Sequence, residues 1–131
     1  MSTFKKSERL SSKKQISSLV INGNTLYCYP FKILWLISPS GPGVPFRMEA
    51  AFSVPRRKFK KAVRRNTIRR RMKEAFRLNK EDFKQHLRDH PCVLSVLIIF
   101  TPRKELGYAE IDHGIKSAFQ ILKNIIQDKT P

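Results

Sequence analysis

A helical pattern near the middle of the chain limits the fold more than any other feature. Within residues 62–78, four apolar side chains recur at i, i+4, i+7 and i+8, which places them on one face of a helix. They are Ile68, Met72, Ala75 and Phe76. A strand-like segment ending at Pro55 precedes this helix, and the continuous apolar segment 92–101 follows it. The sequence therefore predicts a helix that packs by one face on a sheet.

The part before this helix predicts one helix and several strands. Residues 11–22 begin with serines that can cap a helix and end at Gly23, which is typical of a helix C-terminus. Aromatic and branched side chains fill residues 26–37, where Pro30 marks a break, so we expect one long strand or two short ones. A loop over residues 38–45 and an alternating strand over residues 48–54 follow.

The part after this helix predicts one strand and a closing helix. Residues 79–91 continue the helix or form a separate turn, and segment 92–101 is apolar enough to be a strand buried on both faces. Beyond a loop over residues 102–108, apolar residues from Ile111 to Ile125 predict an amphipathic helix, with Asp112 as its cap. The fold class is α+β: a single domain, residues 1–131, in the order helix, strands, helix, strand, helix, with helices packed on a mixed sheet of about four strands.

Positive charge is concentrated in one segment of the chain. Lysine and arginine number 27 against 10 acids, a net charge of +17, and residues 56–77 hold twelve of these bases with Glu74 as the only acid. Such a local excess favours nucleic acid as the partner. The pattern does not fit a membrane-surface helix, because apolar side chains are too few to be exposed opposite the charges.

The helical phase divides the basic segment into a stripe and an approach. At 100° per residue, one polar and four basic side chains share the face opposite the apolar positions, where they can follow a phosphate backbone. This stripe consists of Asn66, Arg69, Arg70, Lys73 and Arg77. The approach to it consists of Arg56, Arg57, Lys58, Lys61, Arg64 and Arg65. We expect these eleven residues to bind RNA.

No catalytic or metal-binding pattern is legible. Cys28 and Cys92 lack partners at metal or disulfide spacing, so we expect buried, reduced thiols. The three histidines have no carboxylates at a repeated spacing, so no metal or acid–base site is predicted. The N-terminal residues lack the apolar stretch of a signal peptide, and we therefore expect a cytoplasmic protein.

Residues 58–70, KFKKAVRRNTIRR, resemble the arginine–asparagine–arginine signature of the bacterial ribonuclease P protein family. Residues 4–10, FKKSERL, followed by a helix ending at Gly23, are similar to the N-terminus of that family, and the element order agrees throughout. Two positions depart from the pattern: Thr67 stands where the signature commonly has its second arginine, and Lys60 stands where many members have glycine.

The resemblance implies a protein subunit of ribonuclease P, an endoribonuclease whose catalytic centre lies in its RNA subunit. Its partners would be the catalytic RNA and precursor tRNA. From the sequence itself we expect no membrane partner, and no obligate protein partner is legible. Mg²⁺ would act through the RNA during removal of the 5′ leader. The implied fold is that of the second domain of ribosomal protein S5, with a left-handed β–α–β crossover around the basic helix, although general rules favour a right-handed one.

The resemblance also implies a cleft for the single-stranded leader, between the first helix and the exposed face of the sheet. The matching positions are Ile16 and Val20 on the helix, and Phe31, Ile33, Trp35, Phe52 and Val54 on the strands. Strand alternation allows only one face of the segment after Pro30 to meet the leader. Either Phe31 and its alternates or the set that begins with Lys32 can form that face, and the sequence leaves the choice open.

Three other functions are compatible with parts of the pattern. A ribosomal or assembly protein that binds structured RNA without any role in cleavage would have the same charge distribution. A protein-only nuclease would need a carboxylate cluster that is not legible here. A helix-turn-helix DNA-binding protein would need a partner helix just before the basic one, where a strand is predicted instead.

Overall fold

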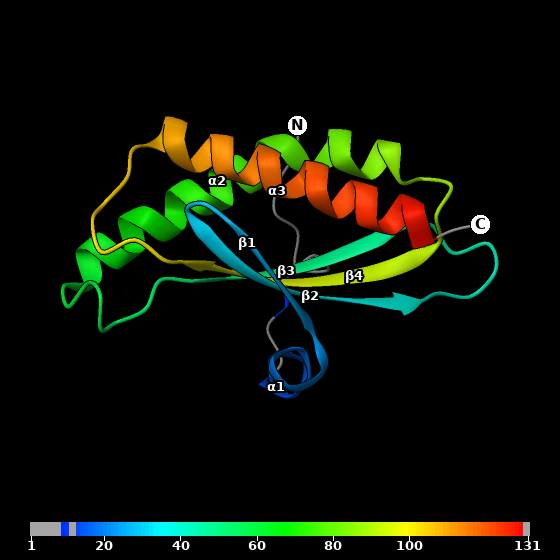
Figure 1. The fold of residues 1–131 in the computed structure, drawn as a ribbon, viewed down its shortest axis with the longest axis horizontal. Coiled ribbons are helices and arrows are strands. Elements are labelled where there is room, and N and C mark those ends of the chain that lie inside the picture. The colour runs from blue at the N-terminus through cyan, green and yellow to red at the C-terminus, as the bar shows by residue number, and fades with distance from the viewer. Residues whose placement is uncertain (1–8, 11–12, 130–131) are drawn as a thin grey trace.

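The computed structural model describes residues 9–10 and 13–129 and contains three helices and four strands in these ranges (Figure 1). The helices are α1 (Lys13–Asn22), α2 (Ala62–His86) and α3 (Tyr108–Lys129). The strands are β1 (Asn24–Cys28), β2 (Phe31–Pro39), β3 (Arg47–Ser53) and β4 (Cys92–Phe100). The predicted α+β class and element order are confirmed.

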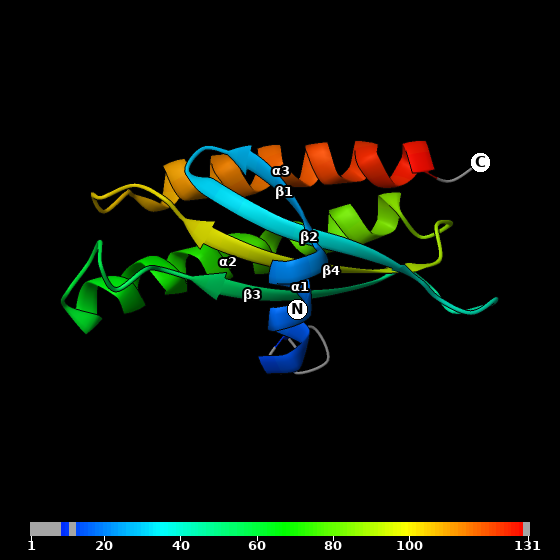
Figure 2. The same cartoon turned by 60° about the horizontal axis from the view of Figure 1, so that its bottom comes forward.

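The strands form one mixed sheet in the order β1-β2-β4-β3. Neighbours β1–β2 and β2–β4 are antiparallel, whereas β3 and β4 are parallel and are joined through α2. Viewed from the α2 side with these two strands pointing upward, β4 lies to the left of β3, so this crossover is left-handed (Figures 1 and 2). The hand implied by the family resemblance is therefore the one found.

Helices cover the two faces of the sheet unequally. The long helices α2 and α3 lie together over one face, and the short α1 crosses the other (Figures 1 and 2). The main core lies under the long helices, where Ile68, Met72, Ala75 and Phe76 are all fully buried. The helical phase predicted for α2 is therefore confirmed, and it turns the opposite face of this helix outward.

Under α1 lies a second, smaller apolar cluster. Leu19 of α1 packs there with Leu10 and Leu97, and Ile16, Leu34, Leu36, Ala51 and Ile99 pack against them, partly buried. Alternate residues of β4, from Cys92 to Phe100, are buried in the main core, but on the α1 side only Leu97 is buried. The prediction that this strand is buried on both faces is correct for the core side and only partly correct for the other.

Local signals explain several element boundaries. Residues 26–37 form two strands separated by a turn with a cis Tyr29–Pro30 peptide bond, and α2 continues past residue 78 to His86. The Gly23 amide donates to the Leu19 carbonyl at 2.8 Å, and a Cβ atom at Gly23 would lie only 2.3 Å from that oxygen, so glycine is needed where α1 ends. The predicted capping serines at 11 and 12 lie outside the described residues.

Two smaller predictions need correction. Asp112 is not the cap of α3, because that helix begins four residues earlier, at Tyr108; its carboxylate instead accepts a hydrogen bond of 2.9 Å from the Asn79 side chain of α2. Both cysteines are free thiols, as predicted, but only Cys92 is buried, while Cys28 is partly exposed. Burial raises the pKa of both thiols.

Candidate nucleic-acid interface

A groove on the outer side of α2 collects the whole predicted basic stripe. It is lined by Asn66, Arg69, Arg70, Lys73, Glu74 and Arg77, and we call it the basic groove. The five stripe residues are brought together as predicted, because their spacing places them opposite the buried positions of α2. Four cations and one anion therefore face solvent in a single depression, an arrangement suited to a phosphate backbone. That they bind RNA stays a prediction.

Side chains within the basic groove also contact one another. Asn66 Oδ1 accepts a hydrogen bond of 3.2 Å from Arg69, and Arg77 Nε donates to Glu74 Oε2 at 3.1 Å. The hydrogen bonds from Arg77 hold the pKa of the Glu74 carboxyl below its usual range. Glu74 therefore stays charged at neutral pH and neutralises part of the groove.

Arg9 joins this surface, although it was not among the predicted site residues. It forms a parallel bridge with Ala50 at the outer edge of β3, and the Leu10 amide donates to the Ala50 carbonyl at 2.9 Å. Partial burial, followed by the charges of Arg69 and Arg9, lowers the pKa of Lys73. The N-terminal segment thus brings a further arginine close to the basic groove. Only its basic character is visible in the sequence, because the pairing with β3 is a long-range contact.

Two of the predicted approach residues fix the loop before α2. Lys58 Nζ donates to the Thr101 carbonyl, and Arg65 Nη1 donates to the Phe59 and Lys60 carbonyls at 2.8 and 3.0 Å. Partial burial and the nearby charges of Arg57 and Arg103 lower the pKa of Lys58. These two side chains therefore have a structural role in the free protein, whatever they contact in a complex.

The other four approach residues are exposed. They are Arg56, Arg57, Lys61 and Arg64. Thr67, which departs from the family signature, turns its hydroxyl back to the Val63 carbonyl of the preceding turn at 2.9 Å. The loop and first turn of α2 thus extend the positive surface beyond the basic groove.

A second depression lies beside α1 on the other face of the sheet. Its lining comes from all of the elements around it: Lys14, Gln15, Ser18 and Leu19 from α1, Leu36 and Ser38 from β2, Glu49 from β3, and Val93 and Ser95 from β4. Glu49 is nearly buried and accepts a hydrogen bond of 3.2 Å from Arg47. A cleft between the first helix and the sheet is therefore present, as the resemblance implies.

Most residues predicted to line that cleft lie elsewhere. Phe31, Ile33, Trp35 and Val54 are buried in the main core, on the side covered by α2 and α3, and Phe52 packs edge-on against Phe76 with ring centroids 5.4 Å apart. These five predictions are corrected, because the face of β2 that meets α1 carries Lys32, Leu34 and Leu36. On α1 itself, Ile16 packs in the small cluster while Val20 is 58% exposed.

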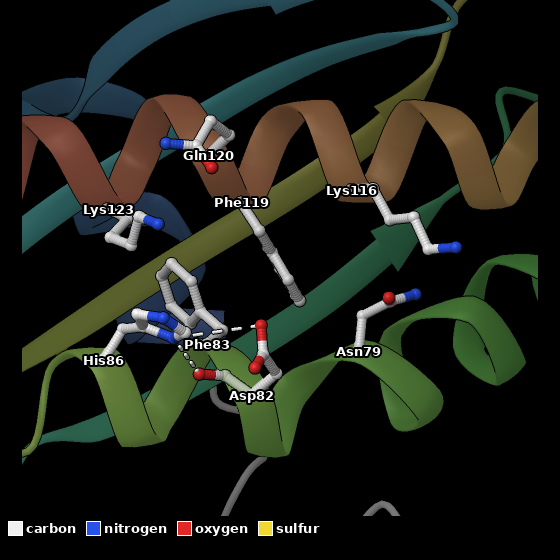
Figure 3. A pocket seen from close by; sticks show the side chains of 8 residues that line it. All are labelled: Asn79, Asp82, Phe83, His86, Lys116, Phe119, Gln120 and Lys123. Carbon is white, nitrogen blue, oxygen red and sulfur yellow. Dashed lines mark hydrogen bonds and ion pairs between the residues drawn. The ribbon is translucent and has the colours of Figure 1, made fainter.

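A third depression lies between α2 and α3, on the side away from the sheet (Figure 3). Phe83 and Phe119 stack with ring centroids 4.5 Å apart, and polar side chains of both helices surround them. His86 Nδ1 lies 2.8 Å from the carbonyl of Asp82 in the preceding turn of α2, and Lys116 forms an ion pair of 3.0 Å with Asp112. This depression is less basic than the first, and Asn79, Lys116 and Gln120 each bond to a side chain outside its lining.

Among residues 9–10 and 13–129, no three His, Cys, Asp or Glu side chains come together where they could share a metal ion. None of the helices in the same ranges is long and apolar enough to cross a membrane.

Comparison with known proteins decides the family. The model of the ribonuclease P family matches residues 4–125. The chain belongs to the ribonuclease P protein family. A protein of this family is the protein component of a tRNA-processing endoribonuclease.

Individual relatives agree with this assignment. The ribonuclease P protein component of Petrotoga mobilis is 35% identical over 126 residues, covering 92% of this chain and 91% of that protein. The one from Porphyromonas gingivalis is 24% identical over 121 residues, covering 92% and 87%.

Solved structures show the same fold. The ribonuclease P protein of Staphylococcus aureus superposes with a TM-score of 0.65 at 18% identity, covering 90% of this chain and 97% of that one. The ribonuclease P protein of Thermotoga maritima gives a TM-score of 0.65 at 19% identity, covering 87% and 96%.

Proposed function

We propose that this chain binds the catalytic RNA subunit of ribonuclease P through the basic groove and holds the 5′ leader of precursor tRNA on the α1 face of the sheet. By doing so it promotes magnesium-dependent hydrolysis of the bond that joins the leader to the tRNA. The observation that carries this proposal is the basic groove itself, which gathers Arg69, Arg70 and Lys73 on the exposed side of a rigid helix.

The division of the two RNAs between two surfaces rests on their shapes and charges. A folded catalytic RNA presents phosphate backbones, which suit a row of cations with few apolar groups. A single-stranded leader exposes the faces of its bases, which suit a partly apolar surface such as the one around Leu34 and Leu36. The two surfaces lie on different sides of the molecule, so both RNAs can be bound at once.

The protein's own part is binding and positioning. We expect the magnesium ions that the reaction needs to be held by the RNA subunit and its substrate, and hydrolysis to take place there. A protein that processes precursor tRNA in this way would work in the cytoplasm of a bacterial cell. Binding by neutralising phosphates would also lower the concentration of magnesium needed to hold the two RNAs together.

Reconstitution tests this proposal. Cognate catalytic RNA is mixed with precursor tRNA at a low magnesium concentration, where the RNA alone is slow, and cleavage is measured with and without the protein. We expect the protein to increase kcat/KM and to have no nuclease activity by itself. If the protein binds the catalytic RNA but leaves kcat/KM unchanged at every magnesium concentration, it is a structural RNA-binding protein and the proposal is wrong.

A further inference from the structure

A row of four side chains crosses the α1 face of the sheet at one end. Tyr27 of β1 lies opposite Lys32 of β2, Lys32 opposite Ile99 of β4, and Ile99 opposite Ser53 of β3. Directly opposite residues point to the same side of a sheet. The neighbour of Lys32, Phe31, is buried in the main core, so this row faces away from the core.

The row begins where the basic segment begins. Ser53 ends β3, and the exposed Arg56 and Arg57 follow three and four residues later. At the end of β4, Lys58 donates to the Thr101 carbonyl, which holds the basic loop against this end of the sheet. At the usual spacing of strands, about 14 Å separates β3 from β1 along the row. Positive charge thus lies at one end of the row and Tyr27 at the other.

The Tyr27 end of the row is accessible because α1 lies mainly over other parts of the sheet. This helix crosses the middle of the strands, away from the end where β3 and β4 finish and β1 turns into β2 (Figure 2). The apolar cluster under it contains Leu34, Leu36 and Leu97 and extends to Ile99 of the row, but it does not include Tyr27 or Lys32. Tyr27 is 74% exposed, so its ring is accessible beside Lys32.

We propose that Tyr27 and Lys32 bind one nucleotide of the leader, with the base stacked on the Tyr27 ring and a phosphate beside the Lys32 ammonium group. This inference rests on the proposed function and extends it to particular residues. The occupant is single-stranded RNA, because an exposed aromatic ring next to a cation matches the flat face of an unpaired base and the phosphate of the same nucleotide. The simpler alternative is that the two side chains only form a cross-strand pair that stabilises the sheet.

The test compares two precursor tRNAs in the reconstituted holoenzyme. One has a natural leader, and the other has abasic nucleotides throughout the leader, which keep the phosphates but remove every base. We expect Tyr27→Val to lower kcat/KM for the natural leader by about five- to a hundredfold, the worth of one stacked base, and to leave the abasic substrate unchanged. Tyr27→Phe, which keeps the ring, should stay within about twofold of the parent protein.

Matched controls separate stacking from folding. Tyr29 is also exposed, at 66%, but it lies in the turn outside the row, so Tyr29→Val should leave both substrates unaffected. Lys32→Gln should reduce the salt dependence of binding by about one phosphate contact for both leaders, and Lys32→Arg should restore it. Thermal unfolding and affinity for the catalytic RNA are measured for every variant, and we expect them to match the parent protein.

Three other outcomes would contradict this expectation, and each has a different meaning. Equal losses for both substrates, or a lowered unfolding temperature that accounts for the loss, would show that Tyr27 is only a structural cross-strand partner. No loss for either substrate, with the parent protein still stimulating cleavage, would overturn the inference and leave the proposed function standing. If the parent protein itself fails to stimulate the catalytic RNA, the proposed function is wrong.

Discussion

Two depressions flank α2, and they differ in how their charges are used. In the basic groove, Arg69, Arg70 and Lys73 face solvent together with a single acid. Between α2 and α3, the charges are nearly balanced, His86 contacts Asp82, and a stacked phenylalanine pair lies among the polar side chains (Figure 3). The two sides of one helix therefore differ: the side toward α3 packs in the fold, and the outer side presents its charges to solvent, where we propose that RNA binds.

The largest effect should come from the side that holds the fold. Phe119 is buried and contacts both Phe83 and Phe76, whose ring centroids lie 4.5 and 5.6 Å from its own. Phe119→Ala should lower the free energy of unfolding by about 3–5 kcal/mol, because a large cavity replaces the ring. Urea denaturation measures this, and Phe119→Leu, which keeps most of the volume, should cost clearly less. A loss below 1 kcal/mol would mean that this contact does not join α2 to α3.

The next effect should come from the binding side. Replacing Arg69, Arg70 and Lys73 together with glutamine should weaken binding of the catalytic RNA about a hundredfold near 0.15 M salt and flatten the salt slope by about two to three. Filter binding across a salt series measures both quantities. The matched control replaces Lys116 and Lys123 in the α2–α3 depression with glutamine and should change neither. If the control loses as much affinity as the triple variant, binding depends on total charge and not on the basic groove.

The sequence predicted this division of α2 because helical phase is a local property. Once Ile68, Met72 and Phe76 are assigned to the core, the 100° rotation per residue determines which residues face outward. The end of α2 depends on long-range contacts, because in the polar sequence after position 78 Phe83 packs against Phe46 and Phe119. The pattern within one helix was therefore sufficient to predict which residues line the basic groove.

Contacts between distant elements could not be predicted in this way. Both faces of β2 are apolar, because Leu34 and Leu36 pack under α1 while Ile33 packs in the main core, so alternation alone did not show which set meets the leader cleft. The position of Arg9 beside the basic groove depends on pairing with Ala50, 41 residues away in sequence. The sequence pattern around Asp112 predicts a helix cap, because its long-range partner, Asn79, is not visible in that pattern.

Two adjacent arginines of α2 sharpen the comparison. Arg70 lines the basic groove, whereas Arg71 donates to the Leu106 carbonyl at 2.7 Å and pairs with Glu105 at 3.2 Å, which holds the loop before α3. Arg71→Ala should lower the free energy of unfolding by about 1–2 kcal/mol, since a hydrogen bond from a charged group is lost, and leave RNA affinity unchanged. Arg70→Ala should leave the free energy of unfolding unchanged and weaken binding of the catalytic RNA roughly fivefold at 0.15 M salt. Urea denaturation and filter binding are measured for both variants. If the two variants lost the same stability and the same affinity, Arg70 and Arg71 would not have separate roles.

The smallest effect concerns the only acid in the basic groove. Arg77 donates hydrogen bonds to Glu74 and holds the pKa of its carboxyl below the usual range, so Glu74 is ionised throughout pH 5.5–8 and opposes a phosphate in the groove. Glu74→Gln should therefore tighten binding of the catalytic RNA by roughly two- to fivefold, because the guanidinium of Arg77 becomes available to phosphate.

The gain in affinity should be the same at pH 5.5 and pH 8, because the carboxyl of the parent protein gains no proton in that range. A gain that disappeared at pH 5.5 would show that the pKa of Glu74 lies well above its ordinary value and that Arg77 does not hold the carboxylate in solution. Weaker binding at both pH values would show that the ion pair itself shapes the groove for RNA.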